Sequence, residues 1–186
     1  MITVPRGGIA IKKTMLLTVV ILSVVAFGSS AFAGERMGAP VAHSKDFDRM
    51  KSLVGVWEGK ADMGKGTEQF KITYELTSAG NAIVEKFAAG QPHEMITVYH
   101  DHDGKLALTH YCSLGNQPHM ELTTSGDGAM QFVLSERAPN LVSLQEMHMH
   151  AHGIAIDGKN SMTQTWTLYD KGAKVNEVAV KLTRAM

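Results

Sequence analysis

Cysteine and clustered positive charge are scarce in this sequence. Cys112 is its single cysteine, so no disulfide can form within one chain and stability has to come from packing. The 18 basic residues balance 18 acidic ones, and nowhere do they form a basic run interleaved with aromatic residues. Such runs are typical of nucleic-acid binding, so we expect no nucleic-acid partner.

Apolar runs long enough to cross a membrane are confined to the first 33 residues. Residues 1–14 are basic and contain no acid, residues 15–25 are apolar, and residues 31–33 read Ala-Phe-Ala. This is the pattern of a secretory signal peptide cut after Ala33, with an uncleaved membrane anchor as the alternative. The sequence therefore predicts a periplasmic or extracellular protein with no stable membrane insertion after cleavage.

The remaining residues, 34–186, suit a single domain. Residues 34–43 are rich in glycine, proline and polar residues and lack periodicity, which predicts a flexible leader. Residues 44–53 then predict one short helix, because Ser44 can cap it and two aspartates fall in its first turn. We expect residues 44–186 to form the folded domain.

From residue 56 onward the apolar pattern has a period of two, which is typical of β-strands. Turn residues separate the runs, including Asp-Gly pairs at 103–104 and 157–158 that predict tight hairpins. The expected strands occupy residues 56–61, 69–77, 82–88, two arms around the 103–104 turn within 93–114, and then 120–124, 130–135, 144–156, 161–169 and 175–184.

About ten short strands joined by tight turns predict an all-β, up-and-down antiparallel barrel with one short N-terminal helix. No helix separates the strands, so parallel crossovers are excluded. Closure removes the exposed edges that an open sheet would leave, although a two-sheet sandwich is an alternative. A membrane barrel is disfavoured because many strands are shorter than the roughly 9–11 residues needed to cross a bilayer.

The hairpin around residues 103–104 predicts a cavity wall. A two-residue loop places Thr97 and Tyr99 on the same face as Leu108, His110 and Cys112. That face mixes apolar, aromatic and polar groups, which suits the lining of a cavity better than a dry core.

A short helix followed by Gly55-x-Trp57-x-Gly59 and about ten strands resembles the lipocalin and fatty-acid-binding superfamily. The chain is most similar to an uncharacterised group of secreted bacterial lipocalin-like proteins, on residues 110–112 (His-Tyr-Cys) and 115–118 (Gly-Asn-Gln-Pro). The resemblance implies a barrel with a ligand cavity and no known activity. Nitrobindin-type haem barrels share the Gly-x-Trp-x-Gly element but carry an axial histidine on the last strand. This chain has none there, which argues against haem.

Nine histidines make a metal site the alternative function. His148, His150 and His152 are spaced so that a regular strand would point all three to one face. Such a face can hold zinc or copper when a neighbouring strand adds a ligand, for which His110 or His119 is available. The opposing interpretation is a wet strand face whose histidines have no chemical role.

Two further side chains are ambiguous. Cys112 lies two residues from His110, but that separation is too long for a nucleophile–base pair, and a buried inert thiol is the expected state. Glu85 lies inside the barrel if Ile83 and Phe87 face inward, and in solvent if Val84 does. No catalytic constellation is evident.

We therefore expect a secreted barrel that binds a small apolar or amphipathic molecule, and the sequence favours binding over catalysis without deciding between them. Its expected ligand-binding residues lie on the strand faces that carry the alternating apolar residues, and together they offer apolar and polar groups. They are Trp57, Tyr74, Thr97, Tyr99, His110, Met120, Gln164 and Trp166.

Overall fold

The alternating runs form ten antiparallel strands in a computed structural model that describes residues 41–62 and 66–186. The predicted signal peptide and most of the predicted leader, residues 1–40, lie outside the described residues. The strands are β1 (Gly55–Asp62), β2 (Thr67–Thr77), β3 (Ala82–Phe87), β4 (Met95–His102), β5 (Lys105–Tyr111), β6 (His119–Gly126), β7 (Ala129–Leu134), β8 (His148–Gly158), β9 (Ser161–Asp170) and β10 (Ala173–Arg184).

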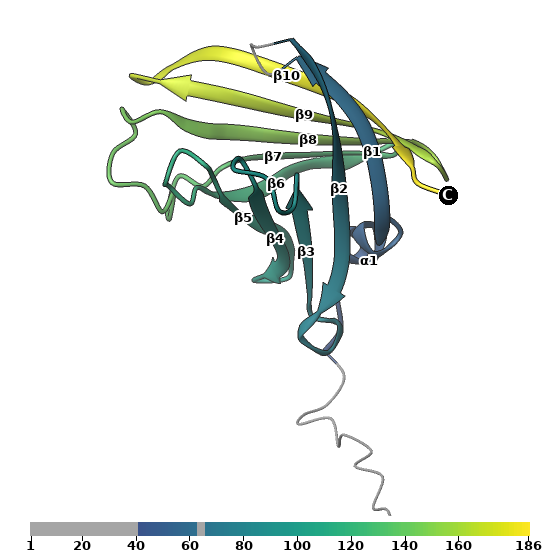
Figure 1. The fold of residues 1–186 in the computed structure, drawn as a ribbon. Helices are drawn as coiled ribbons and strands as arrows, with labels where there is room; N and C mark the ends of the chain where they lie inside the picture. Colours follow the sequence, from purple (N-terminus) through teal and green to yellow (C-terminus); the bar gives the residue numbers. More distant parts are fainter. Residues whose placement is uncertain (1–40, 63–65) are drawn as a thin grey trace, which may run out of the picture. The chain divides into compact units, whose positions relative to one another are not determined.

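These strands close into a barrel in the order of the chain. β1 pairs with β2 on one side and with β10 on the other, so that Trp57 lies opposite both Ile72 and Arg184. Figure 1 shows the first and last strands side by side. The predicted up-and-down barrel is confirmed. The two-sheet sandwich is wrong, since it would leave β1 and β10 unpaired.

One of the two predicted Asp-Gly turns is confirmed and the other is displaced. Asp103 and Gly104 form the two-residue turn between β4 and β5, both with positive φ. The second hairpin instead turns at residues 159–160, because Gly158 still pairs with Ser161. The register shifts between Ile156 and Gly158, and this irregularity lengthens the strand past the predicted turn.

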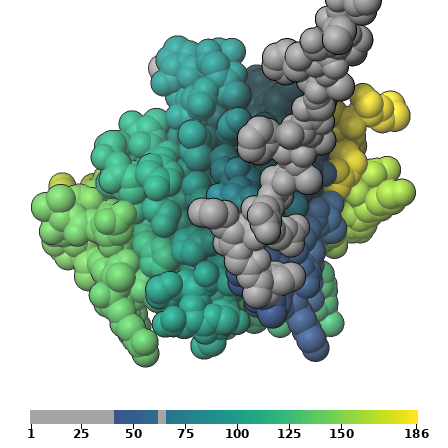
Figure 2. Space-filling model, turned by 90° about the horizontal axis from the view of Figure 1, so that it is seen from below, coloured from purple at the N-terminus to yellow at the C-terminus, as the bar shows by residue number. Residues whose placement is uncertain are grey.

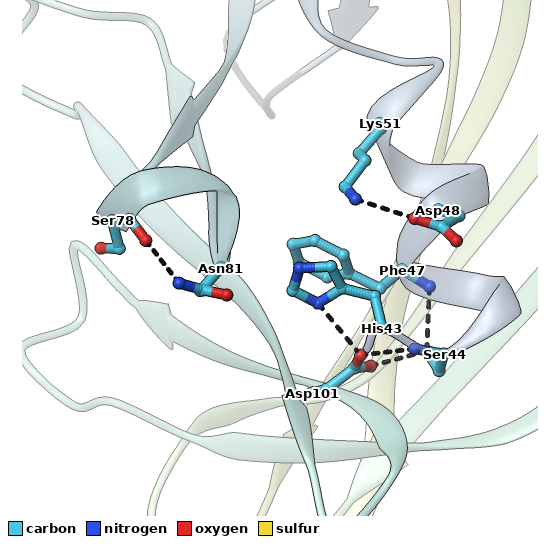
Figure 3. A network of polar contacts seen from close by, with 8 residues as sticks. All are labelled: His43, Ser44, Phe47, Asp48, Lys51, Ser78, Asn81 and Asp101. Atoms are coloured by element: carbon cyan, nitrogen blue, oxygen red, sulfur yellow. Dashed lines mark hydrogen bonds and ion pairs between the residues drawn. The ribbon is translucent and has the colours of Figure 1, made fainter. Parts of the chain in front are cut away.

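The helix α1 (Lys45–Lys51) begins at the predicted cap. The Ser44 hydroxyl accepts the Phe47 amide at 3.0 Å. Ser44 also donates its own amide and hydroxyl to Asp101 of β4, at 2.7 and 2.6 Å (Figure 3). The helix buries Phe47 and Met50 and contacts β4 and β5. The same serine therefore starts the helix and docks it on the barrel.

Arg184 joins the end of β10 to the start of β1. Its guanidinium lies 4.3 Å from the ring of Trp57 and donates to the carbonyls of Val54 and Ser52, at 2.8 and 2.7 Å. The Trp57 indole in turn donates to the Leu53 carbonyl at 2.8 Å. These bonds satisfy carbonyls that follow the short helix and hold it at the barrel seam.

Because the strands alternate in direction, their connections divide between two ends. We call one the helix end; it carries α1, the 3₁₀ turn η1 (Ser78–Gly80) and the tight turns at 103–104, 127–128 and 159–160. In the view from below, the blue atoms of the N-terminal described residues border the teal atoms of the middle strands (Figure 2). The other, the cavity end, carries the loops 88–94, 112–118 and 135–147.

The interior at the helix end is filled. Large, fully buried side chains from the helix and from several strands fill it: Phe47, Met50, Leu53, Trp57, Ile83, Leu106, Leu108 and Phe132. A more open pocket of about 490 Å³ also lies at this end, bordered by Leu53, Trp57, Ile156 and Arg184. The more enclosed cavity lies in the other half of the barrel.

Candidate functional site

A row of polar side chains crosses the inner face of four neighbouring strands. Tyr74 of β2 pairs with Glu85 of β3, Glu85 with Thr97 of β4, and Thr97 with His110 of β5. Directly paired residues in an antiparallel sheet point to the same face, so the pairing alone brings the four together. Each is at most 3% exposed.

The far wall of the barrel completes the row from β8 and β9. Gln164 donates to the Tyr74 hydroxyl and, at 3.2 Å, to Glu85 Oε2. The Tyr99 hydroxyl is hydrogen-bonded to Glu85 Oε2 at 2.7 Å and to His152 Nε2 at 3.1 Å. We call this hydrogen-bonded set the polar belt. It consists of Tyr74, Glu85, Thr97, Tyr99, His110, His152 and Gln164.

Burial shifts the pKa values of the ionisable side chains in the belt. Loss of hydration lowers the pKa of His152 to about 3 and that of His110 to about 4. Burial also raises the pKa of Glu85, and the hydrogen bonds around its carboxyl group oppose this rise. It raises the pKa of Tyr74 and Tyr99 well above the usual phenol value. Every one of these shifts favours the uncharged form of the side chain.

A cavity of about 230 Å³ lies at the cavity end of the barrel, against the polar belt. Glu85, His110 and Gln164 form its polar part. Its other walls are mostly apolar and come from six strands: Phe70, Ile72, Phe87, Met95, Met149, Trp166, Leu168, Asn176, Val178 and Val180. No lysine or arginine is among these lining residues.

His110 carries an unsatisfied polar atom in this wall. Its Nδ1 lies 2.9 Å from the Thr97 hydroxyl, and its ring centroid lies 4.5 Å from that of Trp166. Its Nε2 is buried and has no hydrogen-bond partner among the described residues. A buried N–H without an acceptor costs free energy, so this atom is the part of the wall that a ligand can stabilise.

The structure divides the predicted ligand-binding residues into three groups. His110, Gln164 and Trp166 line the cavity. Tyr74, Thr97 and Tyr99 lie behind the wall and hold it through hydrogen bonds. Trp57 and Met120 are fully buried and are not among the lining residues.

Sequence reasoning missed several apolar wall residues. Phe70 and Val178 lie on the inward parity of their strands, so alternation was the signal that could have found them. Met149 carried no such signal, because a bulge turns it inward.

That bulge also rearranges the three histidines of β8. The register to β9 shifts between Met149 and Ala151, so His150 stacks on the Tyr169 ring, with centroids 3.8 Å apart. His148 joins that pair, with its Nε2 3.2 Å from His150 Nδ1. His152 instead stacks on the cavity residue Trp166 at 3.9 Å. The expectation that all three histidines share a face assumed a regular strand, and the bulge changes this arrangement.

A second histidine group lies on β4 and β6. The rings of His100, His102 and His119 have centroids 6.1 to 6.5 Å apart in each pairing. Across the described parts of the chain, however, no three histidine, cysteine, aspartate or glutamate side chains are arranged to hold a metal ion. Neither histidine group is a formed metal centre in this geometry.

Cys112 is buried at the end of β5. Its burial raises the pKa of the thiol, which keeps it protonated and weakly nucleophilic. His110 engages Thr97 through Nδ1. The site therefore has no activated nucleophile at this position.

The fold and the site together define a closed ten-stranded antiparallel barrel with a small internal cavity. No protein-family model matches the chain, and no curated protein matches it significantly. Within the described residues, no helix is both long and apolar enough to cross a bilayer.

Several solved structures are similar in part. One is a protein of unknown function from the DUF3598 family of Nostoc punctiforme, with 16% identity, TM-score 0.49, and coverage of 80% of this chain and 53% of that one. The chain thus spans about half the length of that protein. Another is a redesigned β-barrel, with 11% identity, TM-score 0.34, and coverage of 73% and 94%. A third, a protein named EF1p2_mFAP2b bound to DFHBI, has 12% identity, TM-score 0.36, and coverage of 75% and 98%.

Proposed function

We propose that this protein binds a small, mostly apolar molecule inside the barrel. The observation that carries the proposal is the cavity of about 230 Å³, with apolar walls and a few buried polar groups on one side. Small-molecule sites usually have this composition, because apolar walls supply affinity and a few polar groups set orientation. The packed helix end gives the cavity a rigid support.

The size of the cavity limits the ligand. Drug-sized ligands occupy pockets of roughly 300 to 1,000 Å³, and an engineered cavity of about 150 Å³ holds benzene. A cavity of about 230 Å³ lies between these cases. It suits a molecule of one or two rings and is too small for haem or a long-chain fatty acid in an extended form.

Trp166 offers a direct reporter of binding. The chain has two tryptophans, and only Trp166 lines the cavity, while Trp57 is fully buried at the helix end. We expect neutral one- and two-ring aromatic compounds to change the tryptophan emission of the mature protein in a saturable way. In Trp166→Phe the remaining emission comes from Trp57 and should not change when the compound is added, although calorimetry should still detect binding.

A cavity-filling variant tests the location. Val178 lines the cavity, so Val178→Phe should fill part of it and weaken binding by roughly five- to 150-fold, the equivalent of 1–3 kcal/mol of overpacking. Val175→Phe is the matched control on the same strand, since Val175 is 54% exposed. Equal binding by both variants, or no saturable response to any compound in the wild type, would overturn the proposal.

We also propose that the protein is exported and is a lipocalin-like barrel. The signal-peptide pattern of residues 1–33 supports export, and the Gly-x-Trp-x-Gly element on β1 supports the likeness. Expression of the full chain in a bacterium should yield a periplasmic or secreted protein whose intact mass is that of residues 34–186. A cytoplasmic product that keeps residues 1–33 would contradict export.

A further inference from the structure

The position of the proton on His110 follows from its one hydrogen-bond partner. A hydroxyl has a single hydrogen to donate, and His110 Nδ1 is the acceptor within reach of the buried Thr97 hydroxyl among the described residues. If Nδ1 carried the proton, the Thr97 hydrogen would be buried without an acceptor. Thr97 therefore donates to Nδ1, and the proton of the neutral imidazole resides on Nε2.

The Nε2–H of His110 then needs an acceptor. The Trp166 ring, 4.5 Å away between centroids, offers at best an N–H···π contact, which is weaker than a bond to oxygen. His110 belongs to the cavity wall. An oxygen on a bound molecule is thus the partner that this wall lacks.

The protonation state of Glu85 follows from a similar count of hydrogens. The Thr165 carbonyl can only accept, so His152 Nδ1, 3.2 Å from it, carries the proton. A neutral His152 then accepts at Nε2, and the Tyr99 hydroxyl gives it its single hydrogen. The 2.7 Å contact between Tyr99 and Glu85 Oε2 therefore needs a hydrogen from Glu85. This carboxyl group is protonated, as its burial without a cation also favours.

These protonation states leave the cavity without charge. Lysine and arginine are missing from its lining residues, and its one carboxyl group holds a proton. An anionic ligand would find no cation, and a cationic ligand would find no carboxylate. Each would lose hydration without gaining a counter-charge.

We propose that the cavity selects uncharged ligands that carry a hydrogen-bond acceptor, such as an aryl ketone, ester or amide, and that His110 Nε2–H is the donor that recognises them. This inference rests on the proposed small-molecule binding and specifies its ligand class. His110 acts as the specificity residue, and Thr97 positions it by fixing its tautomer.

Four one-ring compounds of similar size test the selection by calorimetry at pH 7: acetophenone, ethylbenzene, benzoate and benzylammonium. We expect the two neutral compounds to bind and the two ions to bind roughly tenfold more weakly or not at all. Because ethylbenzene is the more hydrophobic compound, the informative quantity is the ratio of acetophenone to ethylbenzene affinity in each variant.

His110→Phe keeps an aromatic ring in the wall and removes the donor. We expect it to shift the affinity ratio roughly two- to tenfold toward ethylbenzene, the worth of one net hydrogen bond. Thr97→Val, which is nearly isosteric, is the second variant. It frees the tautomer of His110 and should shift the ratio in the same direction. Val175→Phe, outside the cavity, should leave the ratio unchanged.

Each outcome has a separate meaning. If ethylbenzene and acetophenone both fail to bind the wild type, the proposed function fails. If both bind and the ratio is the same in the wild type, His110→Phe and Thr97→Val, binding stands and the role of His110 is wrong. Tighter binding of benzylammonium than of acetophenone, abolished in Glu85→Gln, would show an ionised Glu85. An infrared carboxylic-acid band at pH 7 that disappears in Glu85→Gln is expected if Glu85 is protonated.

Discussion

His152 shows how a single buried residue sets the response of the molecule to acid. Its pKa is lowered to about 3 by burial, against 6.5 for an exposed histidine. Below pH 6.5 the unfolded chain therefore binds a proton that the folded chain does not bind. The stabilisation is complete above about pH 6.5 and is lost as the pH falls toward 3.

We predict that His152 makes the protein less stable as the pH falls from 7 to 5. For this window, linkage gives a decrease of about 2 kcal/mol in the free energy of unfolding from His152 alone. His152→Phe keeps the stack on Trp166 and should reduce the pH dependence by about that amount in urea denaturation. An unchanged slope in the variant would contradict a neutral buried His152.

Glu85 acts with the opposite sign. Its raised pKa means that the folded chain keeps a proton which the unfolded chain releases, so its contribution falls as the pH rises above the usual carboxyl range. The wild-type curve therefore contains both effects. His152→Phe also frees the Tyr99 hydroxyl to donate to Glu85, so the comparison is made in a Glu85→Gln background, which removes the Glu85 contribution from both proteins.

Sequence alone could place some of these residues and not others. Thr97 and His110 follow from the Asp-Gly turn, since a two-residue loop fixes every pair on the hairpin. Glu85 remained ambiguous because both parities of its strand are apolar. Its inward position is decided by pairing with Tyr74 and Thr97, which only the closed sheet supplies.

At the scale of the elements, turn chemistry determines register. Gly104 has φ +76° in the turn between β4 and β5, a conformation that residues with a Cβ rarely adopt. We predict that Gly104→Ala lowers the free energy of unfolding by about 1 kcal/mol. Gly126→Ala is the control, because Gly126 has ordinary φ and open space around its Cβ position. Equal stability of the two variants would show that this turn is not strained by a side chain.

Bulges were the features of the elements that sequence could not predict. Alternation assumes one residue opposite one residue, and β8 departs from it near His150 and again near Asp157. The first departure separates His152 from the other two histidines, and the second moves the hairpin turn to residues 159–160. Nothing in residue type marks these positions, because both bulges depend on the pairing with β9.

The barrel as a whole depends on the seam between β1 and β10. A Cβ atom at Gly59 would lie 2.7 Å from a Leu182 methyl and 3.0 Å from the Lys181 carbonyl oxygen. We predict that Gly59→Ala lowers the free energy of unfolding by roughly 1–3 kcal/mol, as overpacking does, measured in urea against Gly126→Ala. If Gly59→Ala were as stable as Gly126→Ala, β1 and β10 would have room for a Cβ atom at this position.

Sequence predicted closure on general grounds, since a long meander of strands must bury its edges. It could not predict how the interior divides. Alternation identifies inward residues without saying whether they touch across the barrel. The packed helix end and the cavity end differ through long-range contacts such as Gln164 with Glu85.

The division of the interior into a packed half and a binding half is the central claim, and the methionines can test it in one measurement. Met95 and Met149 line the cavity, whereas Met120, Met130 and Met162 are buried away from its lining. With methyl-labelled methionine, assigned through Met→Leu variants, an NMR titration with acetophenone should shift the signals of the first two and leave the other three in place. Shifts confined to the other three, or spread evenly over all five, would contradict a cavity at this end of the barrel.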